Sequence, residues 1–241
     1  MIDTHLGGDL IATGARVTTT GDPGQLPPVR GQRYFQGADF TLKHIHRQAL
    51  ESAIIRQAHK VRNEGFYTAD GPDFRVSNYV SAEDFLAADV ILCWKNQTRR
   101  HLNGLARAHR GFSGPPLKGE PVMCLRNDHQ KAVMNGAVYQ LLTDYDPAKR
   151  QIVVVNERND VVTLGRIHME DFDAPPGQPD DPAEVRPFTL AYAATVHKFQ
   201  GSEIERGILI DEYSRSDFRR EWLYTGITRF SKQILIYNSD V

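Results

Sequence analysis

The residues best placed for chemistry begin in the stretch GDPGQLPPV at positions 21–29. It follows the run ARVTTT at 15–20, whose β-branched residues predict a strand. Open α/β sheets bind ligands at the carboxyl ends of their strands, which is where this stretch would lie. The amide of Gln25 both donates and accepts hydrogen bonds, so it can hold a nucleophilic water or a phosphate oxygen. A plain turn rich in proline and glycine is the alternative for this stretch alone.

A second polar stretch, AYAATVHKFQGSE at 191–203, lies between two predicted strands. A loop or helix start at this place offers backbone N–H groups to a phosphate, and side chains to a ribose or a nucleic-acid strand. Taken singly, His197 and Lys198 are just as compatible with an ordinary solvated loop.

The third stretch, WLYTGITR at 222–229, takes the chain from a predicted helix into the last predicted strand. An arginine fixed at position 229 can reach a bound triphosphate. Phosphoryl transfer relies on such cations because they neutralise charge in the transition state. Considered alone, Arg229 would more often be a partner of the helix dipole.

Helical and strand-like segments alternate around these stretches. Helices are predicted where apolar residues recur at helical spacing, and strands where apolar or β-branched residues run together. The predicted helices cover 2–11, 50 to about 63, 98–110 and the surroundings of 218–223, and the predicted strands cover 15–20, 88–94, 188–191, 207–210 and 233–237. This alternation is typical of an α/β domain with a largely parallel sheet.

The pattern changes between 119 and 167, where only short strands are predicted. The strand candidates, separated by turn residues, are 121–125, 137–142, 151–156 and 161–167. A connector rich in proline and aspartate follows at 174–187, after which the α/β pattern resumes. We therefore expect a small β-barrel inserted into an α/β domain.

The composition bounds the class of protein. No apolar run approaches the roughly 18 residues of a membrane span. Cys93 and Cys124 sit in apolar runs, which indicates reduced thiols and a cytoplasmic protein rather than a disulfide framework. The formal net charge is −1, so any surface for nucleic acid has to be a local patch. His44, His46 and His59 lack the further ligand pair that would favour a metal site.

Together the three stretches resemble motifs III, V and VI of superfamily-one DNA helicases, in the RecD-like group with a UvrD-like C-terminal domain. They occur in the family's order and spacing. The sequence LKHIHRQ at 42–48 resembles motif IV, and 88–107 is similar to the family's segment before its inserted module. Positions 119–136 resemble the start of that module, which is an SH3-like barrel in the family. The resemblance covers nearly the whole chain.

The resemblance implies an α/β fold, with a RecA-like parallel sheet of the P-loop NTPase type and an inserted small SH3-like β-barrel. ATP would bind in a cleft between two RecA-like domains. The implied parts are a remnant of the first RecA-like domain at 1–36, the first part of the second at 37–118, the barrel and its linker at 119–187, and the rest of the second domain at 188–241.

The resemblance also implies which residues meet the nucleotide. Gln25 would sense the γ-phosphate and the attacking water. Arg47 and Arg229 would contact the γ-phosphate from the second RecA-like domain. Gly201 and Glu203 would lie near the nucleotide, with Glu203 at the ribose.

Single-stranded DNA is the implied partner of Thr195 and His197. Arg99 begins a basic helix face that would bind DNA phosphates, with an ordinary solvated face as the alternative. The face continues through Arg100, Arg107, His109 and Arg110. Phe199 stands where the family often has a small residue and Phe230 where it commonly has alanine, which puts local packing in question more than chemistry.

The family's phosphate-binding loop has no counterpart in these 241 residues, because the pattern Gly-x-x-x-x-Gly-Lys-Ser/Thr occurs nowhere. The family's Asp-Glu pair for magnesium normally lies just before the residues that match 1–3, so the sequence is expected to begin inside motif II. We therefore expect ATP and Mg²⁺ to be cofactors of an intact protein, and this chain to be inactive alone.

The leading hypothesis is the C-terminal part of an ATP-dependent DNA helicase, which couples ATP hydrolysis to translocation on single-stranded DNA and to duplex unwinding. The alternative is a non-catalytic DNA-binding or regulatory subunit that docks on a separate ATPase half. Neither hypothesis involves a membrane.

Overall fold

The computed structural model describes residues 2, 4–28, 34–35, 37–41, 52–170, 172, 185–214 and 217–240. Arg47, with the whole stretch 42–48 that resembles motif IV, lies outside the described residues. Within the described ranges, no helix is both long enough and apolar enough to cross a lipid bilayer.

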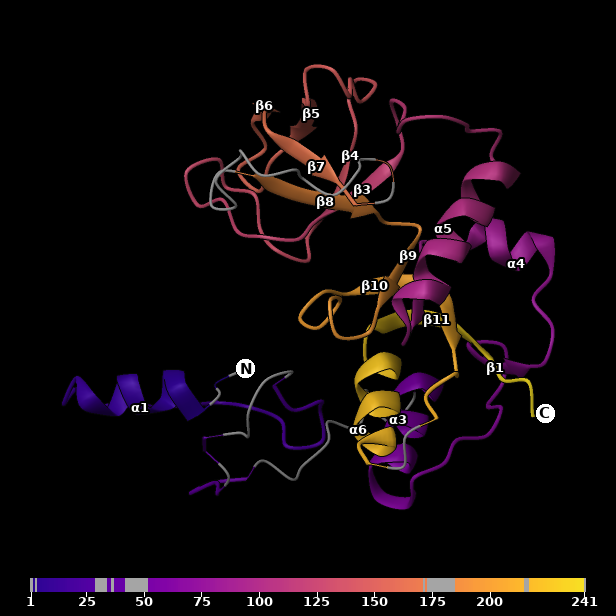
Figure 1. Cartoon of the computed structure of the whole chain (residues 1–241). Helices are drawn as coiled ribbons and strands as arrows, with labels where there is room; N and C mark the ends of the chain where they lie inside the picture. Colours follow the sequence, from indigo (N-terminus) through magenta and orange to yellow (C-terminus); the bar gives the residue numbers. More distant parts are fainter. Residues whose placement is uncertain are drawn as a thin grey trace.

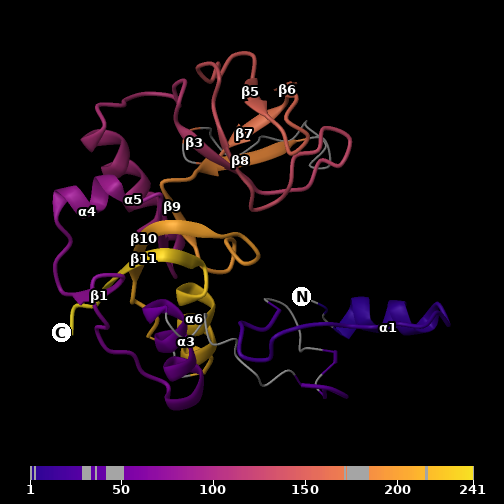
Figure 2. The ribbon, with the colours of Figure 1, turned by 180° about the vertical axis from the view of Figure 1, so that it is seen from behind.

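A five-stranded sheet forms the centre of the larger part of the molecule (Figures 1 and 2). Its strand order is β1, β11, β10, β2, β9, and every neighbouring pair is parallel. The strands are β1 (Phe74–Ser77), β2 (Val90–Cys93), β9 (Ala193–Thr195), β10 (Ile204–Ile210) and β11 (Phe230–Tyr237). All of β2 is buried, as a parallel strand covered on both faces requires. The expected parallel α/β sheet is confirmed.

Helices cover both faces of this sheet (Figure 1). They are α3 (Ala53–Glu64), α4 (Ala82–Ala87), α5 (Asn96–His109) and α6 (Arg219–Ile227). Apolar residues of α3 and α6 share a core with Leu92 and Leu209, whereas those of α4 and α5 pack near Ile91 and Ile208. Because side chains alternate along a strand, consecutive residues of β2 and β10 enter opposite cores.

The β module, residues 119–190, stands apart from this sheet at the top of Figure 1. Four of its strands form a sheet in the order β4, β3, β8, β7, and β5 pairs with β6 as a hairpin. The strands are β3 (Pro121–Cys124), β4 (Val138–Gln140), β5 (Ile152–Val155), β6 (Val161–Leu164), β7 (Ile167–Met169) and β8 (Arg186–Leu190). Buried Tyr139, Ile152 and Phe188 belong to a core of its own. Strands form in all four predicted places between 119 and 167.

One predicted strand joins a different sheet from the one expected. The sequence predicts that a strand at 188–191 resumes the α/β sheet, whereas β8 pairs antiparallel with β3 and parallel with β7. The Ala191 N–H then donates to the Pro121 carbonyl at 2.9 Å, which brings the two ends of the β module together. Strand propensity shows that a segment is extended, but its partner depends on packing far away in the sequence.

The N-terminal segment contains the predicted helix but not the predicted strand. The helix is α1 (Thr4–Ala12). Residues 15–20 are exposed and without regular secondary structure, so the strand prediction there is wrong. β-branched residues favour a strand only where a neighbouring strand supplies hydrogen bonds, and no described strand pairs with this run. Beyond it the chain reaches the α3 and α6 side, where Leu26 is buried in the main core.

Candidate functional site

The segment 21–28 is attached to helix α6. Asp22 and Gln25 close a turn, in which the Gln25 N–H donates to the Asp22 carbonyl at 3.2 Å. The Leu26 N–H donates to the Thr225 hydroxyl at 2.9 Å, and Thr225 is fully buried. This hydrogen bond joins residues 199 positions apart, and it holds the segment that contains Gln25 against the helix that leads to Arg229.

Asp22 anchors the other end of this segment. One carboxylate oxygen accepts the Gly24 N–H at 2.9 Å, and the other accepts the Tyr224 hydroxyl at 2.8 Å. The Arg62 guanidinium of α3 lies 3.4 Å from the same carboxylate and 5.6 Å from the centre of the Tyr224 ring. Burial, and then the hydrogen bond to Asp22, raise the pKa of the Tyr224 phenol, so it keeps its proton and donates.

Gln25 meets the second polar stretch through Gln200. The Gln200 amide donates to Oε1 of Gln25 at 3.2 Å, over a separation of 175 positions. The Oε1 atom of Gln200 is buried and has no hydrogen-bond partner among the described residues. A buried acceptor of this kind is suited to a bound water or a ligand donor. Gln200 was not among the predicted site residues, although it lies in the polar stretch next to Gly201.

Arg229 leaves the end of α6 and points its nitrogens at oxygens of two segments. Nε donates to the Thr225 carbonyl at 3.2 Å, and the two terminal nitrogens donate to the Ser202 carbonyl at 3.1 Å and the Thr228 hydroxyl at 3.3 Å. Burial lowers the pKa of the guanidinium, and the nearby Tyr224 and Glu203 partly offset this. All three acceptors are neutral, so the cation is well placed to receive a further anion.

Gly201 and Glu203 complete the group. Gly201 has a φ of 98°, in the left-handed region that favours glycine, with open space around it, so backbone conformation rather than crowding requires a glycine. Glu203 is exposed on the same loop. The hydrogen bonds from Gln200 to Gln25 and from Arg229 to Ser202 hold this loop to the other two stretches. The structure thus brings together every described residue that was predicted to meet the nucleotide.

The residues predicted to meet DNA differ in their exposure. Thr195 ends β9 and is only 6% exposed, while His197 is half-buried and Lys198 is exposed. Burial lowers the pKa of the His197 imidazole. The Lys198 carbonyl oxygen lies 2.8 Å from where a Cβ atom on Gly136 would stand, so the β module closely approaches this loop. His197 and Lys198 are therefore the residues of this stretch that are accessible enough to contact a DNA strand.

Arg99 lies inside the protein. It is 2% exposed, donates to the Thr189 hydroxyl, and pairs with Glu170 at 3.3 Å. Arg107, on the same face of α5, makes a bidentate pair with Glu120 at 2.7 and 2.8 Å. Arg99 and Arg107 therefore attach α5 to the β module and are buried, so the prediction of Arg99 as a DNA-binding residue is not supported by this conformation, whereas Arg100 and His109 of the same predicted face are exposed.

The two departures from the family pattern are accommodated in the core. Phe199 and Phe230 are 3% and 4% exposed. An atom of the Phe230 ring lies 2.7 Å from where a Cβ atom on Gly207 would stand. The Val90 carbonyl oxygen lies closer still, at 2.3 Å, so any side chain at 207 would collide with the neighbouring strand's backbone as well as with this ring.

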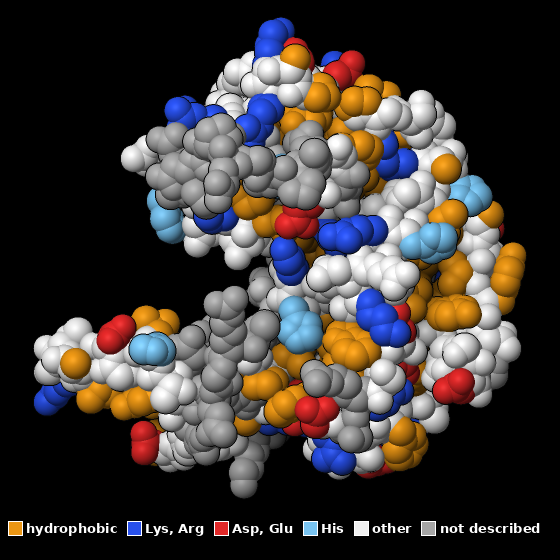
Figure 3. Space-filling model, in the orientation of Figure 1, with side chains coloured by type: hydrophobic (Ala, Val, Ile, Leu, Met, Phe, Trp, Pro, Cys, Tyr) orange, Lys and Arg blue, Asp and Glu red, His pale blue; other side chains and the backbone are white. Residues whose placement is uncertain are grey.

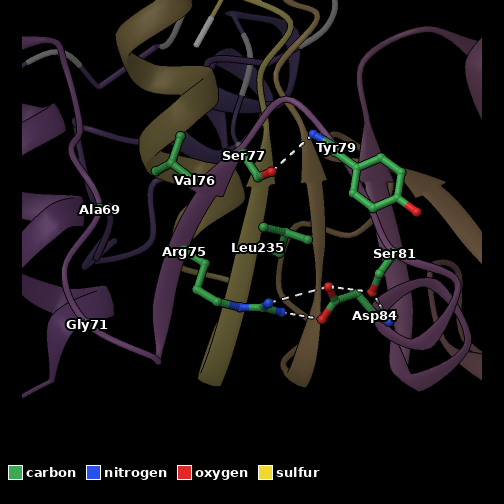
Figure 4. A pocket seen from close by; sticks show the side chains of 9 residues that line it. All are labelled: Ala69, Gly71, Arg75, Val76, Ser77, Tyr79, Ser81, Asp84 and Leu235. Atoms are coloured by element: carbon green, nitrogen blue, oxygen red, sulfur yellow. Dashed lines mark hydrogen bonds and ion pairs between the residues drawn. The ribbon is translucent and has the colours of Figure 1, made fainter.

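A surface pocket of about 380 Å³ lies beside the edge strand β1, away from these residues (Figure 4). Arg75 and Ser81 both bond to the carboxylate of Asp84 there, and the Ser77 hydroxyl accepts the Tyr79 N–H. These polar groups satisfy one another, so the pocket shows no group that is prepared for a ligand. We assign it no role.

The polar loop at 196–203 borders a hollow on the face that Figure 3 shows. This loop, orange in Figure 1, projects between the β module and the N-terminal segment. Figure 3 shows that the same face is hollowed between these two parts. Within the described ranges, no three His, Cys, Asp or Glu side chains are grouped closely enough to hold a metal ion.

Comparison with known proteins finds a matching family model and several similar solved structures. The family model for the UvrD-like helicase C-terminal domain matches residues 190–237. The chain is similar to Pif1 helicase from Bacteroides in complex with ADP-AlF3 and single-stranded DNA, with a TM-score of 0.58 and 18% identity over 90% of this chain and 61% of that one. It is also similar to Pif1 helicase from Candida albicans, with a TM-score of 0.57 and 17% identity over 91% and 63% of the two chains.

This chain thus spans about three-fifths of the length of those helicases. The family match falls on the part that contains β9, β10, α6 and β11, which includes the polar loop and Arg229. The structural likeness extends over nearly all of the chain. The chain therefore has a RecA-like fold that it shares with these helicases, and its residues 190–237 match the family model of the UvrD-like helicase C-terminal domain.

Proposed function

We propose that this chain is the C-terminal part of an ATP-dependent DNA helicase of the RecD-like group. The intact motor would couple ATP hydrolysis to translocation on single-stranded DNA and to duplex unwinding. The observation that supports this best is the meeting of Gln25, Gln200 and Arg229 at one place. These residues come from three polar stretches that resemble helicase motifs, and their side chains suit a water, a phosphate oxygen and a developing negative charge.

Each residue has a part in the proposed hydrolysis. Gln25 orients the attacking water, because its amide can both donate and accept. Arg229 stabilises the charge that spreads over the γ-phosphoryl oxygens in the transition state. Gly201 and Glu203 lie on the loop that receives the nucleotide, with Glu203 at the ribose. Mg²⁺ would neutralise negative charge on the nucleotide phosphates when bound, and its carboxylate ligands would come from a P-loop domain, whose phosphate-binding pattern does not occur in these 241 residues.

Single-stranded DNA would run through the hollow beside the polar loop. His197 and Lys198 face it from the RecA-like part, and the β module, which we propose to be an SH3-like barrel, forms the opposite wall. The backbone contact between Lys198 and Gly136 supports this arrangement, since it fixes the distance between the loop and the β module. The solved structure of Bacteroides Pif1 helicase in complex with ADP-AlF3 and single-stranded DNA shares the fold over 90% of this chain.

ATP hydrolysis is the experiment that tests this function. The purified chain is assayed alone and with a P-loop RecA-like half, which is either restored in the same polypeptide or supplied separately. We expect no DNA-stimulated hydrolysis by the chain alone and stimulated hydrolysis after the P-loop half is added. Robust turnover by the chain alone that survives Arg229→Ala would overturn the proposal.

The alternative, a non-catalytic DNA-binding or regulatory subunit, is supported by the lack of a P-loop lysine in the sequence. The same assay distinguishes the two functions. A regulatory subunit would bind single-stranded DNA and alter the activity of an ATPase half, and the Arg229→Ala and Gln25→Ala variants would behave as the native chain does.

A further inference from the structure

The segment that carries Gln25 is fixed at both of its ends to two consecutive residues of one helix. We propose that Asp22, Tyr224 and Thr225 form a latch that sets the position of Gln25 relative to Arg229. This inference rests on the proposed function, since it assigns positioning residues to the same site. It adds a physical connection between the polar segment at 21–28 and the helix that ends at Arg229.

The first half of the latch is a polar triad. Asp22 accepts the Tyr224 hydroxyl at 2.8 Å and lies 3.4 Å from the Arg62 guanidinium. Its side chain also accepts the Gly24 N–H, so the carboxylate shapes the turn before Gln25. A Cβ atom on Gly24 would lie 3.2 Å from atoms of all three triad residues, so a side chain there would require the triad to shift by a few tenths of an ångström. The Asp22 carboxylate therefore connects the turn to both α6 and α3.

The second half of the latch is Thr225. Its hydroxyl accepts the Leu26 N–H at 2.9 Å, and its carbonyl accepts Nε of Arg229 at 3.2 Å. Thr225 is fully buried, so water does not replace either contact in this conformation. One residue thus touches both the segment of the proposed water-orienting glutamine and the proposed charge-stabilising arginine.

These contacts leave Gln25 little freedom. Asp22 precedes it by three positions and Leu26 follows it directly, and both are fixed to α6. Arg229 lies one helical turn beyond Thr225, so the helix itself sets the spacing between the two ends. Apart from Leu26, the contacts are polar and only partly buried, so they can open without exposing a large apolar surface. A motor that opens and closes its nucleotide cleft needs such a contact.

Amide hydrogen exchange tests the latch without any assumption about activity. In Tyr224→Phe the Gln25 and Leu26 amides keep their own acceptors, Asp22 and Thr225, and only the phenol hydroxyl is lost. If the latch holds the segment, both amides will exchange about three- to tenfold faster, which is the loss expected for one hydrogen bond. Thr225→Val, which keeps the shape of the side chain, should release the segment in the same way. Unchanged exchange in Tyr224→Phe would overturn the proposal.

The chain offers a matched control in a second triad of the same chemistry. The Tyr67 hydroxyl donates to Asp211 at 2.6 Å, and Arg219 pairs with that carboxylate at 2.7 Å. Tyr67→Phe therefore removes a phenol–carboxylate bond elsewhere on the same side of the sheet, together with the hydrogen bond that the Tyr67 oxygen accepts from Asn238 at 2.9 Å. It should leave the exchange of Gln25 and Leu26 as in the native chain. Equal acceleration in both variants would mean general destabilisation and would count against a latch.

A kinetic measurement separates the latch from the proposed function. In the chain joined to a P-loop half, Tyr224→Phe should lower kcat severalfold while the Kd for nucleotide stays near the native value. Faster exchange with an unchanged kcat would make the triad a structural anchor and would overturn its positioning role. If Tyr224→Phe exchanges faster but the native chain joined to a P-loop half never hydrolyses ATP, the attachment of the segment is supported and the helicase function is rejected.

Discussion

The Arg229 guanidinium donates its hydrogen bonds to neutral oxygens, and burial lowers its pKa. An anion that binds beside it would restore much of the interaction lost with water, most strongly when charge builds up in a transition state. In the chain joined to a P-loop half, we therefore expect Arg229→Ala to lower kcat by about 10³ or more and to affect the Kd for nucleotide far less. Steady-state ATPase assays and a nucleotide titration measure the two effects.

Two variants sharpen this test. Arg229→Lys should restore little activity, because a point charge cannot reproduce three directed donors. Arg220→Ala removes an exposed arginine from the same helix and should leave kcat unchanged. Near-normal turnover in Arg229→Ala would make Arg229 a structural residue at a helix end.

His197 should make stability depend on pH. Burial lowers its pKa below the ordinary 6.5, so the unfolded chain binds more protons than the folded one in this range. Stability is therefore complete above about pH 6.5 and falls as the pH drops below it. Urea unfolding at pH 7 and pH 5 should show a smaller loss in His197→Gln than in the native chain.

His59 has a pKa shift in the same direction, also caused first by burial, so His59→Gln should reduce the loss further. The double variant should have the shallowest dependence on pH of the set. A double variant with the native dependence would show that these two imidazoles do not control stability between pH 5 and 7.

The residue types of the site could be predicted from sequence, but the contacts among them could not. Gln25, Gly201 and Arg229 stand in polar stretches at predicted strand or helix ends, where chemistry is expected. Gln200 and Thr225 form hydrogen bonds with residues that lie 175 and 199 positions away in the sequence, and no local sequence pattern predicts such partners. Arg99 shows the reverse error, because a basic residue on a helix face can equally be a buried partner of Glu170.

At the scale of elements, the Arg107–Glu120 pair joins α5 to the β module. Glu120 is fully buried, and its carboxylate also accepts the Tyr192 hydroxyl and the Leu117 N–H. Removal of one partner leaves a buried charge without compensation, at a cost of about 3–5 kcal/mol. We expect Glu120→Ala to lower the free energy of unfolding by roughly this amount, measured by urea denaturation.

A surface pair gives the comparison. Arg75 pairs with Asp84 on the outer side of the molecule, and its side chain is 48% exposed. Arg75→Ala should cost less than about 1 kcal/mol. A similar cost for both substitutions would mean that solvent reaches the Glu120 carboxylate.

The elements themselves were predictable where periodicity is strong. Helices at 53–64 and 96–109 and the buried strand at 90–93 follow from apolar spacing. The run at 15–20 and β8 differ from expectation for one shared reason, which is that pairing is non-local. The former has no described partner strand, and the latter finds its partner in β3 rather than in the parallel sheet.

At the scale of the whole molecule, the hollow of Figure 3 separates the β module from the N-terminal segment, with the polar loop between them. The β module and the N-terminal segment, which line the two sides of this hollow, are attached to the RecA-like part by different contacts. The β module has its own core and a buried ion pair to α5, whereas the N-terminal segment is attached through Leu26 and the Asp22 triad. Relative movement of the two walls would therefore begin at the N-terminal segment, where few apolar contacts would be broken.

The β module should be removable. The hydrogen bond between Ala191 and Pro121 shows that its ends are adjacent, so a short glycine–serine loop can replace 122–190. The parallel sheet should still fold, because none of its strands lies within the excised segment. Arg99 would lose Thr189 and Glu170 but would also gain access to water, so it would not remain as an unpaired buried charge. Exchange protection in β2 and β10 would confirm the two-part architecture, and an unfolded product would contradict it.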